Sequence, residues 1–294
     1  MHTSRRLREL LARDTILVMP GAYDALSARL IQQAGFEAVY MTGAGVSNSM
    51  TGMPDTGLLT LTEMAFNAKN ICNAVQLPVI ADADTGYGNA MNVMRTVWEY
   101  ERAGLAGLHI EDQVTPKRCG HVEGKECIAL EEMVGKVRAA VAARRDPDFV
   151  IIARIDARAP LGFDEAVKRG VACAEAGADA IFPEAMASPE EFAAYARAVK
   201  APLLANMTEF GKTPYLTAQQ FQEMGYKMVI YPMSAVRVAL RAMQAFYVDL
   251  KRTGTQTGWL DRMMTRKELY ELIDYTRFTQ YEREFLGQAQ DPIK

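Results

Sequence analysis

The stretch ERAGLAGLHIED, residues 101–112, decides the fold. It begins as the alanine- and glycine-rich end of a helix, where Gly104 can adopt a left-handed cap. It continues into a short apolar run that ends in two acidic residues. The same helix-end pattern recurs in QAGF, residues 33–36, and in EAGA, residues 175–178. This repeated turn from helix to strand indicates parallel strands that are joined by helices.

Short apolar runs rich in β-branched residues recur along the chain, separated by helix-length segments with apolar residues at three- and four-residue spacing. The eight runs are residues 16–19, 38–41, 79–82, 107–110, 150–153, 180–182, 203–206 and 228–231. Eight near-continuous apolar strands favour an α/β fold of the (β/α)₈ TIM barrel type over an open doubly wound sheet. Gly43-Ala44-Gly45 lacks the full GxGxxG pattern, so we do not expect a dinucleotide site.

The predicted domains are a (β/α)₈ catalytic barrel over residues 1–252 and a C-terminal helical extension over residues 253–294. The eighth helix of the barrel is expected at residues 234–250. Helical patterns follow around residues 265–276 and 280–286. A barrel does not need this extension, so we expect it to pack on its own barrel or on a neighbouring subunit.

Composition excludes several classes of function. The 294 residues are 49% hydrophobic and 23% charged, as in a globular protein, and the net charge of −3 gives no reason to expect nucleic acid or an anionic membrane as a partner. Residues 1–13 are arginine-rich without a long apolar run, so we expect no secretory signal and no membrane span. Cys72, Cys119, Cys127 and Cys173 lack CxxC spacing, which indicates a reducing compartment such as the cytoplasm.

The predicted strands end in polar residues, and in a barrel of this kind catalytic groups lie at the carboxyl ends of the strands. From the third strand to the eighth, the ends are Asp82-Ala83-Asp84, Glu111-Asp112, Arg154-Ile155-Asp156, Glu184, Asn206-Met207-Thr208-Glu209 and residues 231–234. Any one of these could be a loop cap or a solvated edge. Together they would gather many acidic groups on one face, which indicates a binding site.

Clustered carboxylates are costly unless a cation or shared protons relieve their repulsion, and oxygen ligands select a hard metal. Magnesium is therefore the first candidate, with manganese as a possible substitute. Asp82 and Asp84 lie two residues apart at one strand end, and Glu111 follows from the next strand. His109 lies in mid-strand and fits a buried, hydrogen-bonded histidine better than a ligand. Arg154 is suited to grip a carboxylate in a bidentate fork. The predicted site would hold a small polyanionic acid chelated to magnesium.

The stretch TPKRCGH, residues 115–121, is a second place where potentially reactive side chains lie close together in sequence. Lys117, Arg118 and His121 surround Cys119, and cationic neighbours favour a thiolate. Gly120 allows the backbone to move. This pattern fits a reactive cysteine on a mobile loop. A solvated basic turn with an incidental cysteine fits the stretch alone equally well.

These residues resemble the isocitrate lyase and phosphoenolpyruvate mutase superfamily, and within it most closely the 2-methylisocitrate lyases. The resemblance covers nearly the whole chain. Residues 117–121 match the family's catalytic loop, 82–84 its metal segment and 110–113 the next strand end; more specific are residues 206–211, 231–234 with Arg237, and 265–270. The resemblance implies the same barrel, with the eighth helix exchanged between subunits of a dimer and two dimers paired into a homotetramer.

The resemblance also implies roles for individual residues. The implied metal ligands, directly or through water, are Asp82, Asp84 and Glu111, and the catalytic candidates are Cys119, Tyr40, Lys117 and His121. The implied substrate-binding residues are Thr42, Gly43, Ala44, Cys119, Gly120, Arg154, Glu184, Asn206, Met207, Thr208, Arg237 and Arg266. Three positions depart from the lyase pattern: Thr42 replaces a serine, Val122 an arginine and Ile155 a threonine.

The implied reaction is the magnesium-dependent cleavage of 2-methylisocitrate into pyruvate and succinate, as in propionate catabolism. A base would take the hydroxyl proton, and Cys119 would protonate the carbanion that forms on the succinate half. Tyr40 is a candidate for the base, and a simple packing role for it is equally compatible with the sequence. The alternatives are a 2,3-dimethylmalate lyase, a carboxyphosphonoenolpyruvate mutase-like enzyme and a catalytically silent barrel that binds metabolites.

Overall fold

Eight parallel strands form one sheet in the computed structural model, which describes residues 2–118, 124–211 and 213–287. Each strand corresponds to one of the predicted apolar runs. The strands are β1 (Leu17–Ala22), β2 (Val39–Met41), β3 (Val79–Asp82), β4 (Gly107–Glu111), β5 (Val150–Ile155), β6 (Ala180–Pro183), β7 (Leu204–Asn206) and β8 (Met228–Tyr231).

The strand order closes the sheet into a barrel. Hydrogen-bonded neighbours follow the order β6-β5-β4-β3-β2-β1-β8-β7, and every pair is parallel. A parallel bridge between Ile181 and Leu203 joins the two remaining edges. The predicted (β/α)₈ barrel is therefore confirmed.

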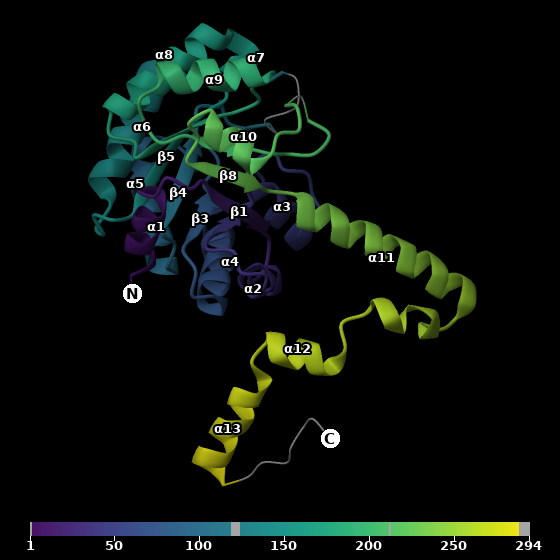
Figure 1. Cartoon of the computed structure of the whole chain (residues 1–294). Coiled ribbons are helices and arrows are strands. Elements are labelled where there is room, and N and C mark those ends of the chain that lie inside the picture. Colours follow the sequence, from purple (N-terminus) through teal and green to yellow (C-terminus); the bar gives the residue numbers. More distant parts are fainter. Residues whose placement is uncertain (1, 119–123, 212, 288–294) are drawn as a thin grey trace. The chain divides into compact units, whose positions relative to one another are not determined.

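Helices connect the strands and surround them on the outside of the barrel (Figure 1). In this first part of the chain they are α1 (Thr3–Leu11), α2 (Ala25–Gln33), α3 (Gly43–Thr51), α4 (Leu61–Ala74), α5 (Ala90–Ala103), α6 (Leu130–Ala143), α7 (Arg158–Leu161), α8 (Phe163–Glu175), α9 (Pro189–Ala198) and α10 (Ala218–Glu223). Gly104 caps α5 with a φ of +95°, and Gly35 and Gly177 also have positive φ, which confirms the predicted left-handed turns.

Side chains of the strands alternate between two apolar clusters, because successive residues of a strand point to opposite faces. On β5, Val150 and Ile152 belong to a cluster inside the barrel, whereas Ile151 and Ala153 pack in the layer between the barrel and its helices. Leu7 and Leu10 of α1 join the inner cluster. The amphipathic N-terminal helix therefore contributes apolar side chains that seal the amino-terminal end of the barrel.

The chain divides into two compact units, residues 1–235 and 236–294. The second unit contains most of α11 (Ser234–Thr253), and then η1 (Thr257–Arg262), α12 (Arg266–Leu272) and α13 (Tyr275–Leu286). The predicted helices at residues 265–276 and 280–286 have a different boundary in the structure. Asp274 adopts a left-handed conformation, with a φ of +58°, and ends the first helix before Tyr275 begins the next. The predicted domain boundary at residue 252 and the exchange of α11 between subunits stay predictions.

None of the helices in the described part of the chain is long and apolar enough to cross a membrane.

Candidate active site at the carboxyl ends of the strands

Inward-facing positions of the strands change from apolar to polar toward the carboxyl end of the barrel. On β5, Val150 and Ile152 are followed by Arg154 at the next inward position. After Phe182 of β6 the next such position is Glu184. The buried polar residues of this layer are Asp82, His109, Glu111, Arg154, Glu184, Asn206 and Thr208. We call it the mouth layer. Each predicted strand end from the third strand to the seventh therefore contributes at least one residue to one buried layer.

Arg154 lies among three carboxylates. Its Nε donates a hydrogen bond of 2.9 Å to Asp156 Oδ2, and its Nη2 donates one of 3.3 Å to Asp156 Oδ1. Glu111 Oε2 lies 3.3 Å from Nε, and Glu184 Oε2 lies 3.8 Å from Nη2. Burial opposes the charge, but Asp156, Glu111 and Glu184 together raise the pKa of Arg154 well above its usual value. Arg154 is therefore a fixed cation in the mouth layer.

Lys117 is the second buried cation of the site. Its Nζ lies 2.5 Å from Asp55 Oδ1 and 2.8 Å from Asp84 Oδ1. Burial raises the pKa of Asp84 to about 6 against the pull of Lys117, and the charges of Asp82 and Asp55 add to the rise. The lysine thus partly compensates the acidic residues at the end of β3.

Asp82 lies against the start of α3. Its Oδ1 accepts a 2.9 Å hydrogen bond from the backbone N–H of Asp84. A Cβ atom at Gly43 would lie 2.4 Å from Asp82 Oδ2, so a side chain at residue 43 would displace the carboxylate. The Thr42 hydroxyl accepts a bond from the Gly45 backbone N–H and caps α3. Thr42, Gly43 and Ala44, all predicted to bind substrate, therefore form the first turn of a helix beside Asp82.

Three buried polar atoms of the mouth layer make no hydrogen bond among the described residues: Glu111 Oε1, Glu111 Oε2 and His109 Nδ1. Burial, which Arg154 and Lys117 only partly offset, raises the pKa of Glu111 well above its usual value. Buried carboxylate oxygens without donors suit a hard cation such as magnesium. In the described part of the chain, however, no three His, Cys, Asp or Glu side chains already converge as a metal-binding group. The donors fit magnesium in kind.

Tyr40 and His109 form a buried pair. The Tyr40 hydroxyl lies 2.8 Å from His109 Nε2, and the two rings stack with centroids 5.7 Å apart. His109 Nε2 also lies 3.8 Å from Asp82 Oδ1. Burial lowers the pKa of His109 to about 4 and, together with Asp82, raises that of Tyr40 well above 10. Both groups are neutral at pH 7. The expectation that His109 is a buried, hydrogen-bonded histidine is confirmed.

The far side of the mouth layer is made by β6 and β7. The Asn206 amide donates to Glu184 Oε2 at 3.1 Å, and the Thr208 hydroxyl donates to Asn206 Oδ1 at 2.8 Å. Met207 packs in the outer cluster, between the barrel and its helices, as its place between two inward-facing residues requires. Ile155 packs in the same outer cluster. Its departure from the lyase pattern therefore changes the packing behind the site rather than the mouth layer.

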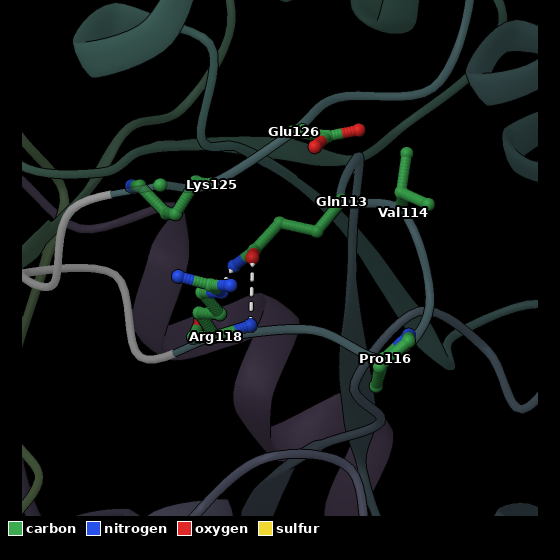
Figure 2. A pocket seen from close by; sticks show the side chains of 7 residues that line it. Gln113, Val114, Pro116, Arg118, Lys125 and Glu126 are labelled. Atoms are coloured by element: carbon green, nitrogen blue, oxygen red, sulfur yellow. Dashed lines mark hydrogen bonds between the residues drawn. The ribbon is translucent and has the colours of Figure 1, made fainter.

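The segment before Cys119 is held by the side chain of Gln113. Gln113 Nε2 donates to the Arg118 carbonyl at 2.9 Å, and Gln113 Oε1 accepts from the Arg118 N–H at 3.0 Å. A pocket of about 270 Å³ lies here, between residues 113–118 and 124–126 (Figure 2). Cys119, Gly120, His121 and Val122 lie outside the described residues.

The two remaining predicted substrate ligands lie in the second unit. Arg237 is in the first turns of α11 and half-buried, and Arg266 is the first residue of α12 and exposed. Their assignment to the substrate site stays a prediction.

Asp55 was missed in the sequence analysis, and the role of Asp156 was not identified there. Asp55, the partner of Lys117, lies in the loop between α3 and α4, and no motif or strand end marks it. Asp156 was visible as a polar residue after β5, but its bonds to Arg154 could not be read from the sequence alone.

Known proteins resemble the chain over nearly its whole length. The chain is 51% identical to a 2-methylisocitrate lyase of Aeropyrum pernix over 285 residues, which are 97% of this chain and 92% of that protein. It is 48% identical to a 2,3-dimethylmalate lyase of Eubacterium barkeri, over 97% of this chain and 99% of that protein. A crystal structure of a 2,3-dimethylmalate lyase, a member of the PEP mutase/isocitrate lyase superfamily, superposes with a TM-score of 0.91 at 41% identity, covering 97% of this chain and 95% of that one.

A crystal structure of phosphonopyruvate hydrolase in complex with oxalate and Mg²⁺ also superposes, with a TM-score of 0.89 at 34% identity, and covers 97% of this chain and all of that one. The family model for phosphoenolpyruvate phosphomutase matches residues 7–251, which include the barrel and every residue of the mouth layer. The chain therefore belongs to the phosphoenolpyruvate phosphomutase family, within the isocitrate lyase and phosphoenolpyruvate mutase superfamily.

Proposed function

We propose that this protein is a carbon–carbon lyase that cleaves 2-methylisocitrate into pyruvate and succinate. The observation that carries the proposal is the combination, in one buried layer, of a fixed guanidinium with the two Glu111 carboxylate oxygens, which make no hydrogen bond among the described residues. Such a layer suits an anionic acid bound together with a hard cation. The 51% identity to a 2-methylisocitrate lyase over nearly the whole chain supports this choice of acid.

Arg154 would bind a carboxylate of the substrate. Asp156 occupies the Nε and Nη2 side of the guanidinium, and within the described residues Nη1 makes no hydrogen bond to the protein. The two N–H groups of Nη1 are therefore available to a ligand. The N–H groups in the first turn of α3, at Gly43 and Ala44, offer further donors for an anion beside Asp82.

Magnesium, or manganese in its place, would be held by Asp82, Asp84 and Glu111, directly or through water. When bound, the ion would stabilise negative charge on the oxygen of the pyruvate half. The unpaired oxygens of Glu111 support this assignment, and a related phosphonopyruvate hydrolase has been crystallised with Mg²⁺. Lys117 now contacts Asp84, and an ion at Asp84 would compete with that contact.

Proton transfer needs an acid and a base. Cys119 would be the acid that protonates the succinate carbanion, and Lys117 and His121 belong to the same stretch of chain. Tyr40 stays the candidate for the base. In the free protein its raised pKa keeps the phenol protonated, so it can act as a base only if the bound substrate and cation lower that pKa.

The alternative function is 2,3-dimethylmalate cleavage, because a 2,3-dimethylmalate lyase matches the chain almost as well, at 48% identity. The deciding experiment is product analysis after incubation with 2-methylisocitrate, isocitrate, 2,3-dimethylmalate and oxaloacetate. Pyruvate and succinate from 2-methylisocitrate, at the highest kcat/KM of the four, are expected. A higher kcat/KM for 2,3-dimethylmalate would replace the proposal with its alternative.

Arg237 and Arg266 provide a second test of the substrate. If they bind carboxylates of a tricarboxylate, replacing either with alanine should lower kcat/KM for 2-methylisocitrate by well over tenfold, since a buried carboxylate that loses a cationic partner costs about 2–5 kcal/mol. A dicarboxylate should lose less from at least one change. Equal losses for both substrates in both variants would contradict the tricarboxylate assignment.

The assembly is proposed to be a homotetramer in the cytoplasm, with α11 exchanged within each dimer. Large apolar side chains of α11 are exposed in the single chain, including Leu240, Met243 and Tyr247, whose spacing places them on one face of the helix. An apolar helix face of this kind suits contact with another subunit. Light scattering on the purified protein should give a mass of four chains, and a monomer would contradict this part of the proposal.

A further inference from the structure

Asp156 is a completely buried carboxylate that bonds to two cations. Its Oδ1 accepts a 2.8 Å bond from Lys125 Nζ, and both of its oxygens accept bonds from Arg154. Its backbone N–H donates to Asp112 Oδ1 at 2.7 Å. None of the motifs discussed above gives Asp156 a role. Asp156 and Arg154 would already balance each other's charge, so charge balance alone does not explain the second buried cation, Lys125.

The geometry around Arg154 distinguishes Asp156 from the other carboxylates. Glu111 and Glu184 approach the guanidinium without forming hydrogen bonds to it, whereas Asp156 bonds to both Nε and Nη2. The guanidinium also lies over the Phe182 ring, with its central carbon 5.1 Å from the ring centroid. Asp156 and Phe182 thus fix the plane of the group, and the N–H groups of Nη1 make no hydrogen bond among the described residues.

Lys125 connects this carboxylate to the segment that follows the KRCGH stretch. The Val114 N–H donates to the Glu126 carbonyl at 2.8 Å, and Gln113 pairs with Cys127 in an antiparallel bridge. Gln113 in turn bonds to the backbone of Arg118 (Figure 2). Asp156 therefore joins the arginine of the mouth layer to a segment whose two sides, residues 113–118 and 124–127, are themselves paired.

We infer that Asp156 is a positioning residue. It orients Arg154 for a substrate carboxylate, and through its bond to Lys125 it couples that orientation to the position of residues 124–127. This inference rests on the proposed function only in that the substrate is a carboxylic acid. It predicts that Asp156 acts through Arg154 and has no direct contact with the substrate.

The test is a double-mutant cycle between Asp156→Asn and Arg154→Met. Asp179→Asn is the matched control, because Asp179 also accepts bonds from two arginines, Arg8 and Arg144, at the opposite end of the barrel. In an otherwise wild-type chain, Asp156→Asn should raise KM for the acid by about tenfold or more, with a smaller change in kcat. In the Arg154→Met background the same change should alter KM little. Asp179→Asn should lower the melting temperature and leave KM unchanged.

Lys125→Met is the second variant, and it decides the inference if Asp156→Asn does not fold. It should raise KM by a few-fold, and this effect should also vanish in the Arg154→Met background. An unchanged KM in either foldable variant, or an effect that persists at full size without Arg154, would overturn the inference. The cycle is run with whichever of 2-methylisocitrate and 2,3-dimethylmalate the wild type cleaves faster, so failure of the proposed substrate leaves the test of Asp156 intact.

Discussion

The two ends of the barrel use the same strands in opposite ways. At the amino-terminal end, Leu7 and Leu10 of α1 pack against apolar inward-facing side chains. Asp179, a charged residue beside this end, is fully paired: its carboxylate accepts bonds from Arg8, from Arg144 and from the Ile151 backbone N–H. Asp179 therefore stabilises the fold, and both of its carboxylate oxygens already have hydrogen-bond partners within the protein.

At the carboxyl end, the inward-facing positions carry buried charges whose partners are incomplete. Both oxygens of Glu111 make no hydrogen bond among the described residues, although Arg154 Nε lies 3.3 Å from Oε2. Leaving such atoms buried costs free energy that packing elsewhere must offset. The comparison of Asp179 with Glu111 indicates that incomplete pairing of a fully buried charge, more than charge itself, marks the end of the barrel that binds ligands.

The largest expected effect is at Cys119, the proposed proton donor. Cys119→Ser should reduce kcat by about 10²–10⁴-fold and leave binding of the product succinate largely intact, because only the acid is lost. Cys72→Ser is the control, because Cys72 packs against the outer cluster, away from the mouth layer, and should leave kcat nearly unchanged. Turnover and succinate affinity by calorimetry measure the two effects. Activity of Cys119→Ser within a few-fold of wild type would exclude the acid role.

A pair of arginines tests the comparison between the two ends directly. Arg154→Met should lower kcat/KM by roughly 30- to 4,000-fold, which corresponds to about 2–5 kcal/mol for the loss of a buried cationic partner of a carboxylate. Arg144→Met removes a 2.6 Å bond to Asp179 and should instead lower the free energy of unfolding by about 1–3 kcal/mol.

Steady-state kinetics and urea denaturation of both variants give the answer. Arg144→Met is expected to keep wild-type kcat/KM at 25 °C, where the native state still dominates. If it lost as much activity as Arg154→Met, the two ends of the barrel would not differ in function as their pairing indicates.

The sequence predicted the barrel well because its signals are local. Residues 79–82 and 228–231 are short apolar runs between polar turns, and they became β3 and β8 without any change of boundary. The break at Asp274 was not predicted, because a left-handed aspartate is allowed locally but rarely required.

Within the site, strand-end residues such as Asp82 and Arg154 could be predicted, since parallel strands deliver their carboxyl ends to one face. The partners could not. Lys117 meets Asp55 across 62 residues of sequence, and Lys125 meets Asp156 across 31, so both contacts depend on how loops pack after the barrel has formed. Ile155, by contrast, was readable as an outward-facing residue, because it lies between two inward-facing ones.

The smallest expected effect is on the pH dependence of metal binding at Asp84. Burial, with the charges of Asp82 and Asp55, raises the pKa of Asp84 to about 6 in the metal-free protein. A raised pKa means that the carboxyl takes up a proton already as the pH falls through 6, and only the ionised form binds a cation well. Manganese affinity should therefore fall by about tenfold between pH 7.5 and pH 5.0 from Asp84 alone, as the ionised fraction of its carboxyl group drops from nearly all to about one tenth.

Electron paramagnetic resonance of free Mn²⁺ measures this affinity, and the Asp84→Asn variant should bind manganese weakly at both pH values. Equal affinity of the wild type at the two pH values would show that Asp84 does not hold the ion, and that its Oδ1 serves only the contact with Lys117.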